Sequence, residues 1–224
     1  MPLLPLGDGR GEVAVDFSLY LITDRHQTMG RPLVAVVRQA LEGGVRTVQL
    51  REKDLSSREL FKLAEELRLI TSQYGARLLI NDRVDIALAI DADGVHLGAA
   101  SQPVSTARRL LGPQRLIGYS AHSVPQAAQA AAEGADFVTF GPVFFTPSKS
   151  DYGEPLGVDQ LRSASEALTI PVFALGGVKR ENIAQVMAAK AHGIALISAV
   201  IAAPDPKRET ASLLQAVELH ANNP

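Results

Sequence analysis

The chain has 224 residues, of which 46% are hydrophobic and 21% charged, and its formal net charge at pH 7 is −2. These numbers suit one large α/β domain with a sizeable core, and they exclude a global basic surplus for holding a nucleic-acid backbone. Cysteine is absent, which excludes disulfides, thiolate zinc sites and cysteine nucleophiles.

Residues 1–15 lack the basic start and long apolar centre of a signal peptide. We predict that they form a flexible leader before a single domain spanning residues 16–222. No apolar run reaches the length of about 20 residues that a membrane helix needs. We therefore expect a soluble cytoplasmic protein with neither a membrane nor a nucleic-acid partner.

Short apolar runs rich in β-forming residues alternate with segments of helical spacing along the rest of the chain. In the segment 56–75, apolar residues recur at steps of three and four, with Ser56 or Ser57 as the predicted N-cap and Gly75 as the end. This alternation predicts an α/β protein with a single (β/α)8 TIM barrel. A doubly wound open sheet is the alternative, because periodicity does not show closure. The predicted strands are 18–23, 47–51, 77–81, 94–97, 115–119, 136–141, 171–175 and 193–197.

Several of these strands end directly in polar or charged residues. Gln49, Arg51 and Lys53 lie at or just beyond the end of the second strand, and Asn81 and Asp82 lie at the end of the third. In a barrel of parallel strands these groups converge on the C-terminal face, where barrel enzymes carry out their chemistry. The pattern therefore predicts a site at that face.

The seventh and eighth predicted strands indicate a phosphate site. Gly176 and Gly177 follow the seventh strand, and Ser198 follows the eighth. Glycine lets backbone N–H groups approach a phosphate, and these two loops are the usual phosphate site of barrels. The alternative is that the glycine pair forms only a tight turn.

The loop 142–155 after the sixth strand is the longest on the predicted active face. Its hydroxyls at Thr146 and Ser148, beside Lys149, are suited to binding an anionic oxygen. Its length favours a shaped lid over a solvated surface loop, which is the alternative.

These residues collect into a pattern that resembles thiamine phosphate synthase, within the thiamine phosphate synthase and thiazole tautomerase superfamily. The resemblance covers residues 18 to about 203 in the right order. Its motifs are Tyr20–Asp24, Gln49–Lys53, Asn81–Asp85, Asp93–Gly98, Gly141–Lys149, Leu175–Val178 and Ile197–Ala199.

The resemblance implies an enzyme that joins hydroxymethylpyrimidine diphosphate to hydroxyethylthiazole phosphate and releases pyrophosphate, with Mg²⁺ as cofactor. Lys149, Arg51 and Lys53 would neutralise the charge that grows on the leaving diphosphate. It also implies Asp82 as a magnesium ligand. The implied pyrimidine diphosphate contacts are Gln49, Arg51, Lys53, Asn81, Ser120 and Lys149, and the implied thiazole phosphate contacts are Thr146, Pro147, Ser148, Gly177, Ile197 and Ser198.

The chain departs from the family pattern after the fourth predicted strand. Ser101 stands where the synthases carry a second magnesium-binding carboxylate, and Ala99 replaces a glutamine. A hydroxyl is a poorer Mg²⁺ ligand than a carboxylate. The departure therefore predicts a weakened metal site that depends on water and substrate phosphates.

Two other functions stay open at this point. Related thiazole tautomerases isomerise a carboxythiazole phosphate. If this chain catalysed that reaction, His122 would be the base that moves the proton. His122 also fits the synthase pattern, or a structural hydrogen bond at a helix start. The other alternative is a non-catalytic protein that binds thiazole phosphate. Alanine-rich helices allow a homo-oligomer as well as packing within the chain.

Overall fold

The structure is a computed structural model that describes residues 14–146 and 154–221. Eight parallel strands close into a barrel in the order β1 to β8, and Leu19 of β1 pairs with Ile194 of β8. This closure confirms the predicted TIM barrel and excludes the open sheet. The strands are β1 (Leu19–Ile22), β2 (Thr47–Leu50), β3 (Arg77–Asn81), β4 (Gly94–Leu97), β5 (Leu116–Ala121), β6 (Phe137–Phe140), β7 (Val172–Leu175) and β8 (Gly193–Leu196).

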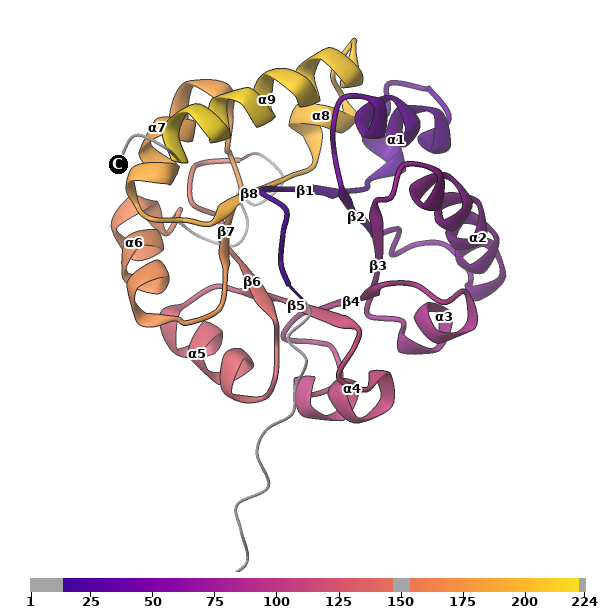
Figure 1. The fold of residues 1–224 in the computed structure, drawn as a ribbon, viewed down its shortest axis with the longest axis horizontal. Coiled ribbons are helices and arrows are strands. Elements are labelled where there is room, and N and C mark those ends of the chain that lie inside the picture. Colours follow the sequence, from indigo (N-terminus) through magenta and orange to yellow (C-terminus); the bar gives the residue numbers. More distant parts are fainter. Residues whose placement is uncertain (1–13, 147–153, 222–224) are drawn as a thin grey trace, which may run out of the picture.

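Helices form an outer ring around the strands, as Figure 1 shows, and α9 runs along α1, α7 and α8. None of the helices in the described ranges is both long and apolar enough to cross a membrane. The α-helices are α1 (Leu33–Glu42), α2 (Ser57–Gln73), α3 (Val84–Ala89), α4 (Val104–Leu111), α5 (Val124–Ala132), α6 (Gly157–Ala167), α7 (Ile183–Ala188), α8 (Ser198–Ile201) and α9 (Pro206–Ala221), and the 3₁₀ turns are η1 (Arg25–Gln27) and η3 (Arg180–Asn182).

Helix α2 shows how the local sequence sets these elements. Ser56 caps it: its hydroxyl accepts from the Glu59 amide, and the Glu59 carboxylate accepts from the Ser56 amide at 3.0 Å. Gly75 follows the helix with φ +60°, a conformation that glycine adopts without a steric penalty. Between these ends, the predicted apolar face is buried against the barrel. Both the capping serine and the terminal glycine agree with the sequence prediction.

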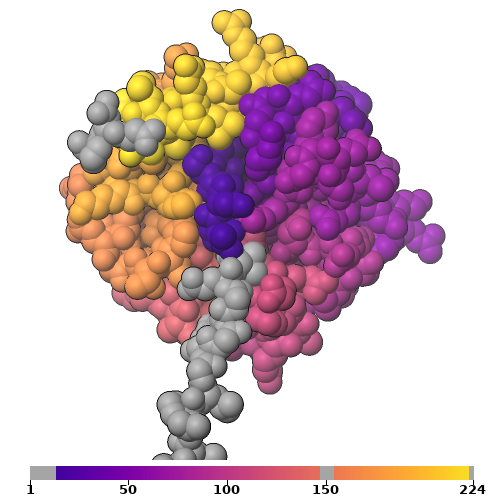
Figure 2. Space-filling model, in the orientation of Figure 1, coloured from indigo at the N-terminus to yellow at the C-terminus, as the bar shows by residue number. Residues whose placement is uncertain are grey.

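An aromatic cluster fills the N-terminal half of the barrel. The ring of Phe17 stacks on Phe173 at 5.1 Å and meets Phe137 edge-on at 5.5 Å, while Tyr20 meets Phe137 edge-on at 5.3 Å. These contacts stabilise the core beyond the area they bury. The indigo segment that begins at residue 14 crosses this end of the barrel in Figures 1 and 2. The N-terminal end is therefore filled, which leaves the C-terminal end for a site.

The predicted leader falls mostly outside the described ranges, which begin at residue 14. The carbonyl of Ala14 accepts a hydrogen bond of 2.8 Å from Arg77, and Asp16 forms an ion pair with the same arginine. The leader boundary at residue 15 stays a prediction.

Candidate active site

Glu52 organises the loop that follows β2. Its side chain is only 1% exposed, and it accepts hydrogen bonds from the Thr23 hydroxyl at 2.7 Å and from the Arg25 guanidinium at 3.2 Å. The backbone N–H of Arg25 also donates to the same carboxylate at 3.1 Å. The Thr23 hydroxyl in turn accepts from the Arg51 amide at 2.9 Å. Glu52 thus joins the ends of β1 and β2 and fixes the backbone that carries Arg51.

Three of the predicted binding residues lie on this fixed segment. Gln49 is 1% exposed on the inner wall of the barrel, and its side-chain amide lies beside the Tyr20 hydroxyl without a hydrogen bond of good geometry. Arg51 is half-buried and Lys53 is exposed, and neither side chain forms a hydrogen bond or ion pair within the described ranges. A buried amide that lacks a hydrogen bond of good geometry is costly, and so a ligand that bonds to Gln49 gains from binding here. The segment offers one buried amide and two cations to such a ligand.

Asp82 lies at the end of β3 in a strained conformation. Its φ is +60°, which is uncommon for a residue with a side chain, and its amide is held by the His96 carbonyl at 3.0 Å. The Asn81 amide donates to one carboxylate oxygen at 2.7 Å, and the Ser101 hydroxyl donates to the other. The Gly98 amide donates to Ser101 at 2.7 Å. The structure therefore brings Asp82 and Ser101 together, as the resemblance implied.

This donor set offers one carboxylate, one hydroxyl and one amide oxygen to a metal. No group of three or more histidine, cysteine or acidic side chains suited to a metal occurs in the described part of the chain. Mg²⁺ is commonly held by one or two carboxylates together with water and substrate phosphates. Asp82 therefore fits a Mg²⁺ ion that arrives with a diphosphate better than a metal held by the protein alone.

Ser120 and His122 come from the end of β5 but differ in their surroundings. Ser120 is half-buried, and its hydroxyl lies 2.9 Å from Nε2 of His96 inside the barrel. His122 is exposed, and its Nδ1 donates to the Gly141 carbonyl at 2.5 Å. Its Nε2 is then the acceptor nitrogen. His122 has the structural hydrogen bond that was one of the alternatives for it, while Ser120 belongs to the interior of the site.

The loops after β6 and β7 lie against each other through their backbones. The Phe144 amide donates to the Gly176 carbonyl at 3.0 Å. Gly177 has φ +65°, and a Cβ atom there would lie 2.5 Å from the Phe145 carbonyl oxygen. Only glycine permits this approach. The predicted glycine pair is therefore more than a simple turn, because it brings two loops of the C-terminal face together.

Ile197 and Ser198 complete this side of the barrel mouth. Ile197 precedes the short helix α8, and Ser198 is its first residue, exposed at the end of β8. The first N–H groups of a helix lack intrahelical partners and favour anions. These residues therefore lie where barrels commonly bind phosphate, and phosphate binding itself stays a prediction.

Part of the predicted site lies outside the described ranges. These residues are Pro147, Ser148 and Lys149. They belong to the loop 142–155, and so its predicted function as a lid stays a prediction. Thr146 is described and is half-buried at the end of the first range.

Sequence reasoning missed the roles of several buried polar residues, although Tyr20 and Glu52 stand within the motifs. Tyr20, His96 and Thr139 are each 2% exposed or less and share a hydrogen-bond network with Ser120. The signal was available, since polar residues in the interior of short buried strands must find partners.

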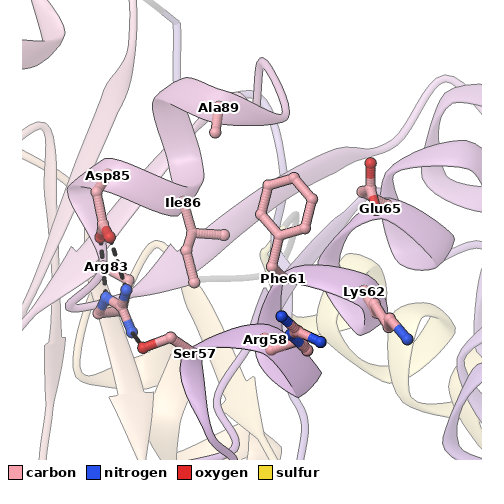
Figure 3. Close-up of a pocket in the computed structure, with 9 residues that line it drawn as sticks. All are labelled: Ser57, Arg58, Phe61, Lys62, Glu65, Arg83, Asp85, Ile86 and Ala89. Atoms are coloured by element: carbon pink, nitrogen blue, oxygen red, sulfur yellow. Dashed lines mark hydrogen bonds and ion pairs between the residues drawn. The ribbon is translucent and has the colours of Figure 1, made fainter.

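A groove of about 700 Å³ lies outside the barrel between α2 and α3. Figure 3 shows Phe61 and Ile86 between the two helices, with Arg83 bonded to Asp85 and Ser57 to one side. Gln49, Arg51 and Asp82 do not line it. It is therefore separate from the barrel mouth.

A closed barrel whose amide, hydroxyl and cationic side chains gather at the carboxyl ends of its strands defines an enzyme of the TIM-barrel class, suited to small phosphorylated substrates. The thiamine monophosphate synthase family matches residues 19–200, and the chain belongs to that family.

Individual relatives agree over most of the chain. A relative in Geobacter sulfurreducens is 62% identical over 200 residues, which are 89% of this chain and 94% of the relative. The thiamine-phosphate synthase of Clostridium novyi is 46% identical over 187 residues, which are 84% of this chain and 92% of that protein. The solved structure of thiamine phosphate pyrophosphorylase from Pyrococcus furiosus superposes with a TM-score of 0.82 at 38% identity, and covers 94% of this chain and 98% of that one.

Proposed function

We propose that this enzyme is a thiamine-phosphate synthase, a transferase that joins hydroxymethylpyrimidine diphosphate to hydroxyethylthiazole phosphate and releases pyrophosphate. The observation that carries the proposal is a juxtaposition at the barrel mouth. Two cations that have no partner among the described residues, Arg51 and Lys53, lie on one segment with the buried amide of Gln49. Family membership supports the same reaction.

The pyrimidine diphosphate binds over the ends of β2 to β5 in this proposal. Gln49 and Asn81 hold the pyrimidine diphosphate, while Arg51, Lys53 and Lys149 neutralise the charge that grows on the leaving pyrophosphate. The bond between the pyrimidine methylene and the diphosphate oxygen breaks, and the thiazole nitrogen then supplies the electron pair for the new bond. The protein needs no nucleophile, because catalysis comes from positioning and electrostatics.

The thiazole phosphate binds on the other side of the mouth. Gly177, Ile197 and Ser198 offer backbone amides and a hydroxyl to its phosphate, with Thr146, Pro147 and Ser148 completing the contacts. The lid proposed for the loop 142–155 would exclude water from the cationic intermediate.

Mg²⁺ is part of the proposal, with Asp82 as its protein ligand. When bound, the ion would supply positive charge to the diphosphate oxygens. The hydrogen bonds that Asp82 receives from Asn81 and Ser101 must rearrange to admit it. The ion is therefore expected to bind weakly in the absence of the diphosphate.

The direct test is formation of thiamine phosphate from the two purified precursors with excess Mg²⁺. If no product formed at every Mg²⁺ concentration tested, the proposal would be wrong. Ser101→Asp restores the second carboxylate, and we expect it to lower the Mg²⁺ concentration for half-maximal rate about tenfold. The matched control is Ser105→Asp, which adds the same charge at an exposed position of α4.

Calorimetric titration of Mg²⁺ into the protein gives a readout independent of turnover. Ser101→Asp should bind Mg²⁺ more tightly than the parent chain, whereas Ser105→Asp should not. Equal affinities in all three proteins would show that position 101 does not contribute to metal binding.

The two alternatives receive less support. A tautomerase with His122 as base has no use for the cations on the β2 segment, although the bond from Nδ1 of His122 to the Gly141 carbonyl is compatible with Nε2 acting as a base. A non-catalytic thiazole phosphate-binding protein would not need those cations either. Isomerisation of carboxythiazole phosphate without metal, lost in His122→Ala, would favour the tautomerase.

We also propose a cytoplasmic location and no nucleic-acid or membrane partner, in keeping with small-molecule substrates and the net charge of −2. We also propose a homo-oligomer, because two apolar side chains are exposed on the surface. They are Leu69 on α2 and Leu88 on α3, which are 68% and 40% exposed. Light scattering after size exclusion tests it: a monomeric mass would contradict the oligomer.

A further inference from the structure

A buried hydrogen-bond chain crosses the barrel from β1 to β5. The Tyr20 hydroxyl lies 3.3 Å from Nδ1 of His96, and Nε2 of His96 lies 2.9 Å from the Ser120 hydroxyl. Thr139 lies beside the far end of this chain, 3.3 Å from the Ser120 hydroxyl and 3.4 Å from Nε2. Tyr20 is 0% and His96 2% exposed, whereas Ser120 is half-buried at the barrel mouth. The chain therefore leads from the core to the site.

The barrel reserves space for the His96 ring. Gly118 stands opposite His96 in the pairing of β4 with β5. A Cβ atom on Gly118 would lie 2.4 Å from Nδ1 of His96 and 2.4 Å from the Phe137 ring. Any larger residue at 118 would displace the imidazole. The position of the ring is thus fixed by the backbone next to it and not only by its hydrogen bonds.

The proton positions in this chain follow from the donors available. Burial raises the pKa of the Tyr20 hydroxyl well above 10, and so this group stays a phenol that must donate. Nδ1 of His96 is the acceptor beside it, which requires the neutral tautomer with its proton on Nε2. Burial, and then the Arg51 charge, lowers the pKa of His96 to about 3, which agrees with a neutral ring.

The proton on Nε2 determines what Ser120 can do. Nε2–H donates to the Ser120 oxygen and occupies one of its lone pairs. The Ser120 hydroxyl must then point its own hydrogen elsewhere, toward Thr139 or toward the barrel mouth. An anionic phosphate oxygen accepts hydrogen bonds and does not donate them. An oriented O–H donor is therefore what a diphosphate needs from Ser120.

We propose that His96 is a positioning residue, held by Tyr20 as the Nε2–H tautomer, which directs the Ser120 hydroxyl toward the substrate diphosphate. The identity of the ligand rests on the proposed function, whereas the tautomer and the hydrogen-bond order do not. Tyr20 acts at the far end of the same chain and contacts no substrate.

The first experiment measures the tautomer directly, without substrate. The protein has five histidines, so nitrogen-15 labelling of histidine gives a small set of imidazole signals. The signal assigned to His96 through its contact with the Tyr20 ring should show a protonated Nε2 and an unprotonated Nδ1. In Tyr20→Phe, Nδ1 loses its donor, and the two tautomers should exchange. A proton on Nδ1 of the parent protein would overturn the proposal even if the enzyme made thiamine phosphate.

The second experiment is a double-mutant cycle on the synthase reaction. Tyr20→Phe keeps the aromatic packing and removes only the hydroxyl, and we expect kcat/KM for the pyrimidine diphosphate to fall about tenfold. The KM for thiazole phosphate should not change. Ser120→Ala should lower kcat/KM about 100-fold. In the Ser120→Ala background, Tyr20→Phe should cost nothing further, because its effect passes through Ser120.

Tyr74→Phe is the matched control, since it removes a tyrosine hydroxyl at the C-terminal end of α2, away from the barrel interior. Its rate should equal that of the parent chain. Multiplicative losses in the double variant would overturn the proposal, as would parent kinetics in Tyr20→Phe. If the parent protein makes no thiamine phosphate, the proposed function fails, and the tautomer measurement still decides the role of His96.

Discussion

The two sides of the barrel mouth are built in different ways. From β2 to β5 the wall consists of polar side chains, with Glu52 and His96 buried behind the groups that face the mouth. From β6 to β8 it consists mainly of backbone, with Gly177 allowing two loops to approach. The first side offers cationic and hydroxyl side chains to a ligand, and the second offers backbone N–H groups.

This difference matches the two phosphate groups of the proposed reaction. A diphosphate that leaves must have its growing charge neutralised, which requires mobile or ionised groups such as Arg51 and Lys53. A phosphate that only anchors its substrate needs fixed dipoles, which backbone amides supply without reorganisation. Removing a buried charge should therefore impair diphosphate binding on the side-chain half. Adding a methyl group to a glycine should impair thiazole phosphate binding on the backbone half.

Removing the charge of Glu52 should have the largest effect. Glu52→Gln keeps the size of the side chain but replaces an acceptor oxygen with a donor that faces Arg25. We expect a loss of about 3 kcal/mol in the free energy of unfolding, because the buried carboxylate accepts charge-assisted hydrogen bonds from Thr23 and Arg25, and Gln keeps only one of the two acceptor oxygens. The kcat/KM should also fall, since Thr23 holds the Arg51 amide. Urea unfolding and steady-state kinetics measure both.

Asp54→Asn is the control for that change. Asp54 pairs with the same Arg25, which holds the pKa of the Asp54 carboxyl well below its usual range, but its side chain is 54% exposed. Exposed pairs contribute little to stability because water and salt screen them. Stability losses of equal size in Asp54→Asn and Glu52→Gln would contradict the role of burial.

Adding one methyl group to Gly177 should damage the other half. Gly177→Ala places a Cβ atom 2.5 Å from the Phe145 carbonyl oxygen and 2.7 Å from the Phe144 Cβ at φ +65°. We expect a loss of about 2 kcal/mol in the free energy of unfolding, from the left-handed backbone and the steric clash together. The KM for thiazole phosphate should rise, with no change in the KM for the pyrimidine diphosphate.

Gly75→Ala separates the two contributions to that loss. Gly75 has φ +60°, and a Cβ atom added there would meet no neighbouring atom within 4 Å. Alanine at this position therefore carries only the backbone cost, about 1 kcal/mol. A Gly177→Ala protein as stable as Gly75→Ala would show that the two loops can separate freely.

Sequence patterns predicted the strands well, since each predicted strand overlaps an observed one. The prediction ended the fifth strand at residue 119, whereas β5 continues to Ala121 because Ser120 and Ala121 pair with β6. That pairing is a contact between distant residues, which local periodicity does not encode. Closure of the barrel is likewise visible only in the pairing of β1 with β8.

Residues of the candidate site could be assigned from the sequence where the residue type itself indicates its chemistry. Ser101 was assigned to the second metal-ligand position beside Asp82, and the two side chains share a hydrogen bond, whereas metal binding stays a prediction. The role of Glu52 was not predictable, because it lies beyond the end of β2, where alternation no longer tells which side chain points inward. The role of His96 was not predictable either, because its partner Tyr20 lies 76 positions away in the sequence.

The buried His96 also makes the side-chain half sensitive to acid, and the predicted effect here is a slope of stability with pH. Its pKa is about 3 in the folded protein, below its ordinary value of 6.5. Below pH 6.5 the unfolded chain therefore binds a proton that the folded chain does not, and the contribution to stability falls as the pH drops toward 3. One such proton corresponds to at most about 1.4 kcal/mol per pH unit.

Urea unfolding between pH 7 and 4.5 measures this slope, and the comparison with variants isolates it from other titrating groups. His96→Gln removes the imidazole whose protonation differs between the two states, so its stability should fall less steeply with acid by about one proton. His220→Gln, near the end of α9, should keep the slope of the parent chain. Burial also lowers the pKa of His192, but that group contributes equally to the parent chain and to His96→Gln. A slope in His96→Gln equal to that of the parent chain would place the acid-sensitive group elsewhere and contradict this origin.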